Sequence, residues 1–221
     1  MIDELSRLLS HGSNALSDAP SDSAVEGSLK PHGSIGAELT HLLRRRNGFY
    51  CFNSALLVRP FSREDDPLGI VQWNARALWR EEFGVDTGNA LFFAEDLFGN
   101  QFCIRENAVT TFDPETGEFN PMCSTLNEWV AKLLSDERVL TASPLAKDWI
   151  ALGNELRPGY RLLPKRPFVV GGSYTLDNLY ALNDVVGMRF RATIANQIRD
   201  VPDGASIQFK FAPMNPSGAE H

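Results

Sequence analysis

Apolar residues recur every three or four positions over residues 125–136, the clearest periodic stretch in the chain. The apolar positions there are Leu126, Trp129, Val130, Leu133 and Leu134. This spacing places the five side chains on one face of an α-helix. Thr125 and Glu128 fit a capping box at the start of that helix. The pattern therefore predicts an amphipathic helix with Trp129 on its buried side.

Weaker helical patterns and end signals predict further helices along the chain. The segments are residues 1–9, 37–46, 75–83, 188–198 and a short helix capped by Thr175. Asn47-Gly48 supplies a stop after the helix over 37–46. Ser143-Pro144 fits the start of another helix, because proline suits the first helical position, and Gly153 closes it.

Short apolar runs bounded by turn residues predict strands. The segments are residues 49–58, 90–94, 101–104, 109–112, 168–170 and the alternating stretch with Ile207, Phe209 and Phe211. In the segment 113–117, Asp-Pro is followed three residues later by glycine, which is a turn signal. Helices and strands alternate without a regular βαβ rhythm. The sequence therefore predicts an α+β fold, with a mixed, mainly antiparallel sheet packed by several helices.

Composition divides the chain into a globular part and two ends. Residues 11–36 are rich in Ser, Gly, Asp, Ala and Pro, and they offer little apolar surface to bury. We therefore expect residues 1–36 to form a flexible N-terminal segment. The remainder predicts a single domain over 37–213, with a core over 37–140 and a C-terminal extension over 141–213. Residues 214–221 are expected to form a tail.

The charge is acidic and unevenly distributed. The chain has 21 Lys and Arg against 28 Asp and Glu, a net charge of −7, which disfavours general nucleic-acid binding. Residues 61–140 carry 15 acidic and 6 basic residues, a net charge of −9. Because an acidic face attracts positively charged molecules, this distribution favours a basic partner.

Three features point to a reducing, aqueous compartment. Cys51, Cys103 and Cys123 are far apart and odd in number, as expected of reduced thiols in a cytoplasmic protein. No apolar run approaches the ~18 residues that a membrane-spanning helix needs. The acidic N-terminal residues 1–5 lack the basic-then-apolar order of a secretory signal. We expect a cytoplasmic protein with no membrane partner.

The sequence lacks the common catalytic and cofactor motifs. It has no Cys/His cluster with zinc spacing, no GxSxG elbow and no glycine-rich phosphate loop. Residues 113–118 resemble a calcium loop superficially, but glycine is fifth and Ser124 occupies the twelfth position, so a hairpin turn is favoured. His41 lies in a predicted helix, where a surface role is favoured over that of a general base. We therefore expect a non-catalytic protein with neither cofactor nor metal.

Paired acidic residues are the remaining candidates for a site. They are Glu64, Asp65, Asp66, Glu81, Glu82, Glu95 and Asp96. Carboxylate pairs support acid–base or metal chemistry when they converge in a cleft. The same residues are also compatible with a solvated surface or with a face that binds a protein partner. Sequence leaves these alternatives open, and we take the seven residues as candidates for partner binding.

Several short motifs follow one another between residues 37 and 136. They are Asn47-Gly48-Phe49, Leu57-Val58-Arg59-Pro60, Trp79, Phe83-Gly84, the run 91–102, the turn 113–117 and the helix with Glu128-Trp129. In this order the motifs resemble the SUKH superfamily, which includes bacterial immunity proteins of toxin systems and fungal regulators of cell-wall glucan synthesis. The resemblance implies a sheet packed by helices, no catalytic residue set, and a function in binding other proteins.

Three functional hypotheses follow from these observations. The first is an immunity protein that neutralises a cognate bacterial toxin by direct binding, with a nuclease as one candidate toxin. The second is a regulatory scaffold of the same family without a toxin partner. The third is an enzyme, which requires Glu95, Asp96 and His41 to line one cleft. In the first hypothesis, the acidic residues attract the basic working face of the toxin and speed association.

Overall fold

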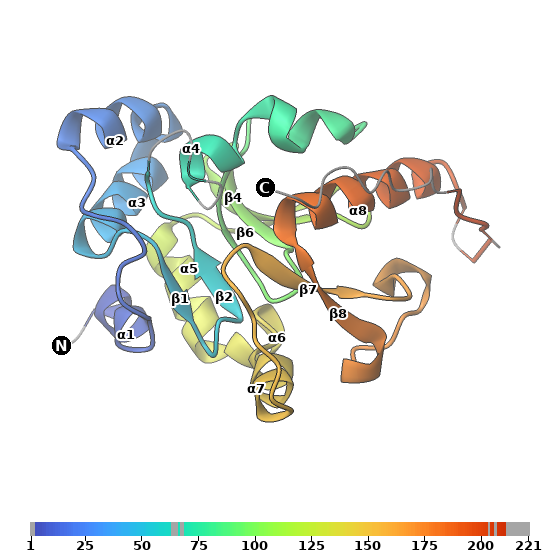
Figure 1. Cartoon of the computed structure of the whole chain (residues 1–221). Helices are drawn as coiled ribbons and strands as arrows, with labels where there is room; N and C mark the ends of the chain where they lie inside the picture. Colours follow the sequence, from blue (N-terminus) through green and yellow to red (C-terminus); the bar gives the residue numbers. More distant parts are fainter. Residues whose placement is uncertain (1–2, 63–65, 67–68, 203, 206, 211–221) are drawn as a thin grey trace.

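A computed structural model gives the structure of this chain and describes residues 3–62, 66, 69–202, 204–205 and 207–210. Six strands form one antiparallel sheet in which sequence order and spatial order agree (Figure 1). They are β1 (Phe49–Cys51), β2 (Leu56–Val58), β3 (Leu91–Glu95), β4 (Gln101–Arg105), β5 (Ala108–Asp113) and β6 (Glu118–Cys123). A second antiparallel sheet pairs β7 (Tyr160–Pro164) with β8 (Leu179–Asn183). The predicted α+β class is confirmed.

Helices surround the larger sheet. The α-helices are α1 (Glu4–Ser10), α2 (Asp22–Leu29), α3 (Gly33–Arg45), α4 (Ile70–Trp73), α5 (Leu126–Ser135), α6 (Glu137–Leu140), α7 (Ser143–Ala151) and α8 (Asp184–Ile198). Short 3-10 turns are η1 (Lys30–His32), η2 (Arg76–Leu78), η3 (Arg80–Glu82), η4 (Phe168–Val170) and η5 (Leu176–Asn178). Within the described residues, no helix is both long and apolar enough to cross a bilayer.

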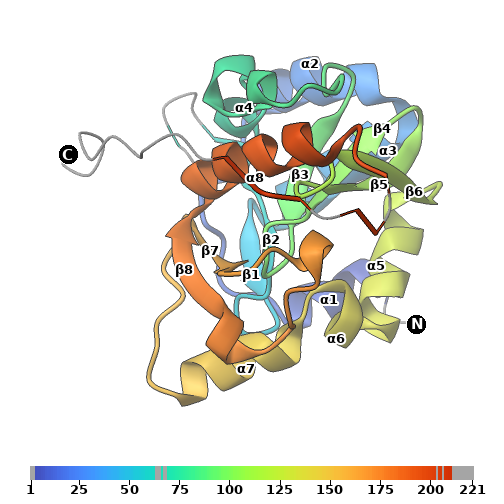
Figure 2. The ribbon, with the colours of Figure 1, turned by 90° about the vertical axis from the view of Figure 1, so that its right-hand side faces the viewer.

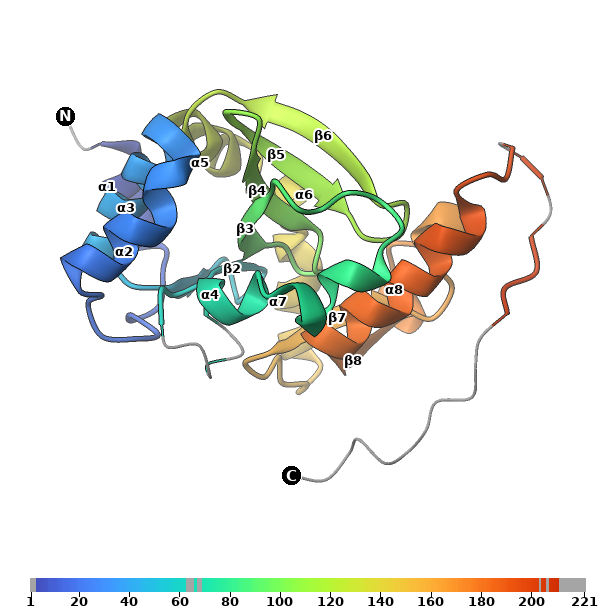
Figure 3. The same cartoon turned by 90° about the horizontal axis from the view of Figure 1, so that it is seen from above.

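One face of the large sheet is covered by α1, α2, α3 and α5 (Figure 3). Trp129 of α5 is fully buried and lies edge-on to Phe93 of β3 and Phe102 of β4. Thr125 accepts a hydrogen bond from the backbone N–H of Glu128, as its capping role predicts. The predicted helix and the burial of Trp129 are therefore confirmed.

The opposite face is packed by an aromatic cluster beneath η2, η3 and α8. Trp79 contacts Phe92 of β3 at 5.0 Å between ring centroids, and Phe112 of β5 at 6.3 Å. Met188 and Ala192 of α8 belong to the same cluster. Figure 2 looks onto this side, with α8 in front of the sheet and α3 behind it. The sheet is thus buried between two layers of helical segments.

The segment 10–36, expected to be flexible, packs against the core instead. Val25 and Leu29 on α2 are fully buried and join the cluster formed by α3, α5 and the sheet. Arg46 ties the first helix to this core by donating hydrogen bonds to the backbone oxygens of Leu9 and Ser13. The few apolar residues of this segment are enough to hold it in place, because they pack against the apolar face of α3. Composition alone did not reveal this packing.

Several predicted elements differ in kind from those observed. Residues 75–83 form two 3-10 turns, because Trp79 has a φ of −158°, which no helix accommodates. Side chains there satisfy backbone carbonyls: the Arg80 guanidinium donates to the oxygens of Asn74, Thr87 and Ala90. Residues 168–170 form the turn η4 and not a strand.

The C-terminal part also contains strands that the sequence pattern did not predict. Strands β7 and β8 occupy 160–164 and 179–183, the second beginning inside the segment expected to be helical after Thr175. Residues 207–210 of the expected last strand are irregular, and Ser206 and Phe211 lie outside the described residues. Strand β6 was missed because none of its residues is buried and they include Pro121, so no alternation of buried positions marks it.

Candidate functional site

The seven acidic residues do not form one exposed face. Glu95 is 1% exposed and Asp96 is 7% exposed, so neither can present a charge to a partner. Glu95 is the last residue of the buried strand β3 and Asp96 follows it, at an end of the strand that Arg161 of β7 and Arg191 of α8 contact. A buried carboxylate must be paired or hydrogen-bonded, and these two are. The assignment of Glu95 and Asp96 to a binding surface is therefore corrected.

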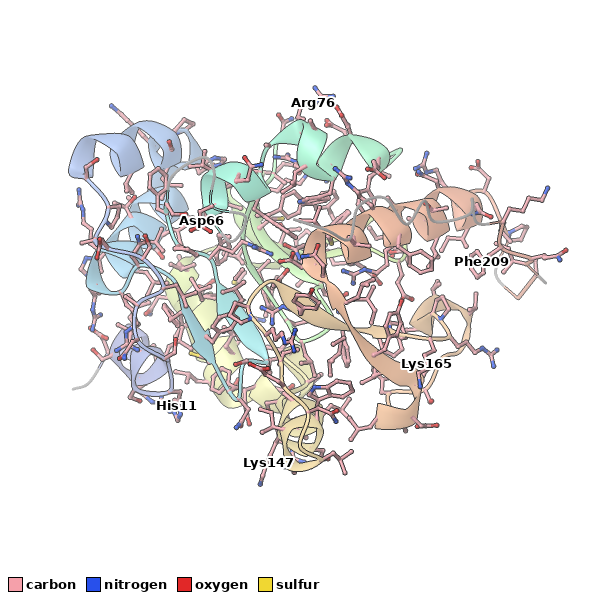
Figure 4. The ribbon with its side chains drawn as sticks, viewed as in Figure 1. His11, Asp66, Arg76, Lys147, Lys165 and Phe209 are labelled. Atoms are coloured by element: carbon pink, nitrogen blue, oxygen red, sulfur yellow. The ribbon has the colours of Figure 1, made fainter. Side chains whose placement is uncertain are left out.

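The other predicted residues lie apart from one another. Glu81 and Glu82 of η3 are exposed, and Glu82 pairs with Arg189 of α8 at 3.0 Å. Asp66 is half-buried below α4, as Figure 4 shows, whereas the segment carrying η3 begins near Arg76 at the top of that view. Glu64 and Asp65 lie outside the described residues. His41 is exposed on α3, whereas Glu95 and Asp96 are buried, which does not support a cleft lined by all three.

Glu95 is the centre of a buried ion-pair network that links the large sheet to the C-terminal part. Its two carboxylate oxygens accept hydrogen bonds from Arg59 at 2.8 Å and from Arg161 of β7 at 2.6 Å. Gln101 donates to the same carboxylate at 2.9 Å. Asp184, the first residue of α8, lies 3.3 Å from Arg59. Residues more than 60 positions apart thus meet at one buried point.

The charges of this network determine the pKa of its acids. Burial acts to raise the pKa of Glu95, but the positive charges of Arg59 and Arg161 outweigh it and hold that pKa at about 2. Burial raises the pKa of Asp184, whose single contact with Arg59 compensates it less fully. The Arg59 guanidinium also lies 3.4 Å from the ring centroid of Trp73, a cation–π contact. The network has a structural role, because its carboxylates and guanidinium groups compensate one another's charge.

Asp96 holds the turn between β3 and β4. Its carboxylate accepts hydrogen bonds from the backbone N–H groups of Phe98 and Asn100, and from the Asn100 side chain at 2.8 Å. Burial nevertheless raises the pKa of Asp96 to about 7. This Asx-type turn places the carbonyls of Phe98 and Gly99 toward α8, where Arg191 donates to both.

Beside this turn lies a polar pocket of about 190 Å³. It is lined by Phe98, Asn100, Asp113, Glu115, Thr116, Phe168, Val169, Tyr174 and Arg191. The predicted turn 113–117 supplies two carboxylates: Asp113 accepts from the backbone N–H of Glu115 at 2.7 Å, and Glu115 accepts from that of Val169 at 2.8 Å. The turn that was predicted as a plain hairpin connection therefore also forms one wall of a pocket.

Aromatic rings form the opposite wall. Phe168 and Tyr174 stack with centroids 4.0 Å apart and an interplanar angle of 9°, and Phe98 packs edge-on against Phe168. Tyr174 remains 62% exposed, and the neighbouring Val169 is 39% exposed. The loop that carries both rings follows β7 and begins near Lys165 (Figure 4). Exposed apolar side chains beside a carboxylate-lined pocket are suited to contact another molecule.

The surface remains hollowed on both sides of the pocket. On one side, Asn100 and Asp113 also line a depression that reaches Val139 and Leu140 of α6. On the other side, Thr116 and Val169 border a depression that extends to the end of α8. Val139 is 75% exposed. Together the three hollows form a groove, which we define by Val139, Asn100, Asp113, Tyr174 and Val169.

Within the described part of the chain, no group of three or more His, Cys, Asp or Glu residues is placed to hold a metal ion. Burial raises the pKa of Cys51 and of Cys103 to about 12, so both thiols are protonated at neutral pH.

Comparison with known proteins provides a fold relationship. No protein-family profile matches the chain, and no curated protein matches it. The chain is similar in fold to Atu4351 from Agrobacterium tumefaciens. The crystal structure of that protein matches with a TM-score of 0.51 over 87% of this chain and 88% of that one. Sequence identity is 14%, so the similarity extends to the fold alone.

Proposed function

We propose that this protein is a non-catalytic, cytoplasmic immunity protein that neutralises a cognate toxin by direct binding. The observation that carries the proposal is the groove, because it combines exposed apolar side chains with carboxylates on one surface. Protein interfaces typically combine apolar or aromatic anchors with polar groups that orient the partner. The resemblance of residues 37–136 to the SUKH superfamily supports the same class of function.

The charge of the chain supports a basic partner. Residues 61–140 carry a net charge of −9, and Asp113 and Glu115 of the groove belong to this segment. A toxin that acts on an anionic substrate, such as a nuclease, needs a basic working surface. Electrostatic complementarity of this kind increases the association rate and is screened by salt.

Co-expression with the products of the neighbouring genes tests the proposal. We expect one of these products to arrest growth when expressed alone, and this chain to restore growth and to co-purify with it. A product that arrests growth but neither binds this chain nor is counteracted by it would contradict the proposal, as would the absence of any toxic neighbour. A stable complex with a harmless neighbour would favour a regulatory scaffold instead.

A further inference from the structure

We propose that the pocket between the β5–β6 turn and the Phe168–Tyr174 stack receives an arginine side chain of the protein partner. This inference rests on the proposed function, since it assumes that the occupant belongs to another polypeptide. It goes beyond that function by naming the chemical group that the surface recognises.

The charge of the pocket favours a cation. Two carboxylates, those of Asp113 and Glu115, line the pocket together with the single guanidinium of Arg191. Arg191 donates to the backbone oxygens of Phe98, Gly99 and Gly187, and among the described residues it forms no ion pair with either acid. Its donors are therefore engaged with neutral oxygens, and the carboxylates outnumber it. An anion entering the pocket would meet more negative than positive charge.

The aromatic wall selects a planar cation. A guanidinium stacks on an aromatic face and donates two parallel hydrogen bonds to a carboxylate, whereas an ammonium is a compact and strongly hydrated charge. Tyr174 offers aromatic surface for such stacking, because its side chain lines the pocket and remains 62% exposed although its ring is stacked on Phe168. Negative potential from Glu115, Asp113 and Asp96 adds to burial in raising the pKa of Tyr174, which places those charges within reach of the ring.

The size and shape of the site fit a side chain presented by a polypeptide. A volume of about 190 Å³ accommodates a guanidinium group and its methylene stem. The hollow continues on both sides of the pocket, past exposed Val139 at one end and Val169 at the other. A free small molecule would leave these flanks empty, whereas an extended segment of a partner would cover them.

Titration with capped amino acids tests the pocket without requiring the partner. N-acetyl-argininamide is titrated into the full chain and followed by amide chemical shifts, with the lysine and citrulline analogues as comparisons. Citrulline has the size and planarity of arginine but no charge. We expect saturable shifts with the arginine probe, at least about fivefold weaker affinity for lysine, and no saturation with citrulline.

Matched variants locate the binding. Tyr174→Ala and Asp113→Asn should each weaken the arginine probe at least about fivefold. Asn retains the oxygen that accepts from the Glu115 backbone N–H, so the turn is preserved. Tyr160→Ala is the control, because Tyr160 is 37% exposed and does not line the pocket. Equal melting temperatures establish that each variant is folded.

Several outcomes would overturn the inference. Citrulline binding as strongly as arginine would remove the role of charge, and unchanged affinity in both pocket variants would place the probe elsewhere. A partner that binds Tyr174→Ala as tightly as the parent chain would refute the pocket while leaving the proposed function intact. An arginine probe that binds as expected, in a chain that no neighbouring gene product recognises, would preserve the pocket and contradict the proposed function.

Discussion

The buried network around Glu95 gives the sharpest test of how this fold is held together. The variant Glu95→Gln keeps the size of the side chain but removes its charge, so two ion pairs are lost at once. Arg59 retains Asp184 at 3.3 Å, whereas Arg161 keeps the backbone oxygen of Ser54 at 3.2 Å and no ion-pair partner among the described residues. The variant thus leaves a buried cation uncompensated.

Removing one partner from a buried ion pair typically costs about 3–5 kcal/mol, because the remaining charge is desolvated without compensation. Both residues qualify as buried, since Arg161 and Glu95 are each 1% exposed. Against a total stability of about 5–15 kcal/mol for a domain, such a loss would be large. We expect the urea midpoint of Glu95→Gln to fall accordingly while the m-value stays constant.

Two further variants complete the design. Glu81→Gln removes an exposed carboxylate of the same kind and should change the free energy of unfolding by no more than about 0.5 kcal/mol. Arg161→Gln closes a double-mutant cycle with Glu95→Gln, and we expect the two losses to be non-additive by at least about 1 kcal/mol. A loss below about 1 kcal/mol in Glu95→Gln, or strict additivity in the cycle, would show that the network is not coupled as its geometry indicates.

Three other predictions follow from single positions. Trp129→Ala should lower the free energy of unfolding by about 3–5 kcal/mol. Trp129→Phe should lower it by less than about 1.5 kcal/mol, because the buried indole N–H has no hydrogen-bond partner to lose. Urea unfolding of both variants distinguishes a packing role from a polar one. Because the pKa of Asp96 is raised to about 7, the folded state keeps a proton that the unfolded chain releases between about pH 4 and pH 7. The free energy of unfolding should therefore fall by about 1.4 kcal/mol per pH unit as the pH rises through that window. Asp96→Asn should flatten this slope, as measured by urea unfolding at several pH values. Gly48→Ala should lower the melting temperature more than Gly153→Ala. Both glycines have positive φ, which costs alanine about 1–2 kcal/mol. A Cβ at Gly48 would also lie 2.6 Å from Pro60, whereas one at Gly153 meets open space.

Local signals in the sequence were sufficient for the elements that depend on local chemistry. The helix α5 begins at a capped threonine and presents Trp129 to the core, as its spacing predicts. The strands of the β3–β5 meander and the turn 113–117 after it were also predicted, because the apolar runs there are bounded by turn residues. In each case the information lies within about ten residues of the element concerned.

Elements that depend on distant partners were not predictable in the same way. Strand β6 has no buried residue and forms because β5 supplies its hydrogen bonds. The helix α2 is stabilised by the apolar cluster that it shares with α3, in which Val25 and Leu29 are buried. Glu95 and Asp96 looked like a charged surface pair because the sequence does not show that Arg59, Arg161 and Asn100 would enclose them.

The candidate pocket shows most clearly why a site can escape a reading of the sequence. Its carboxylates come from a turn, its rings from a loop about 50 residues later, and its guanidinium from α8. Each part has an ordinary local explanation, since Asp113 initiates a turn and Arg191 caps carbonyls. Only their convergence gives the pocket an unbalanced negative charge beside an open aromatic face. Because a partner would recognise that combination and none of its parts, variants should be judged by the binding of a charged probe, with stability as the control.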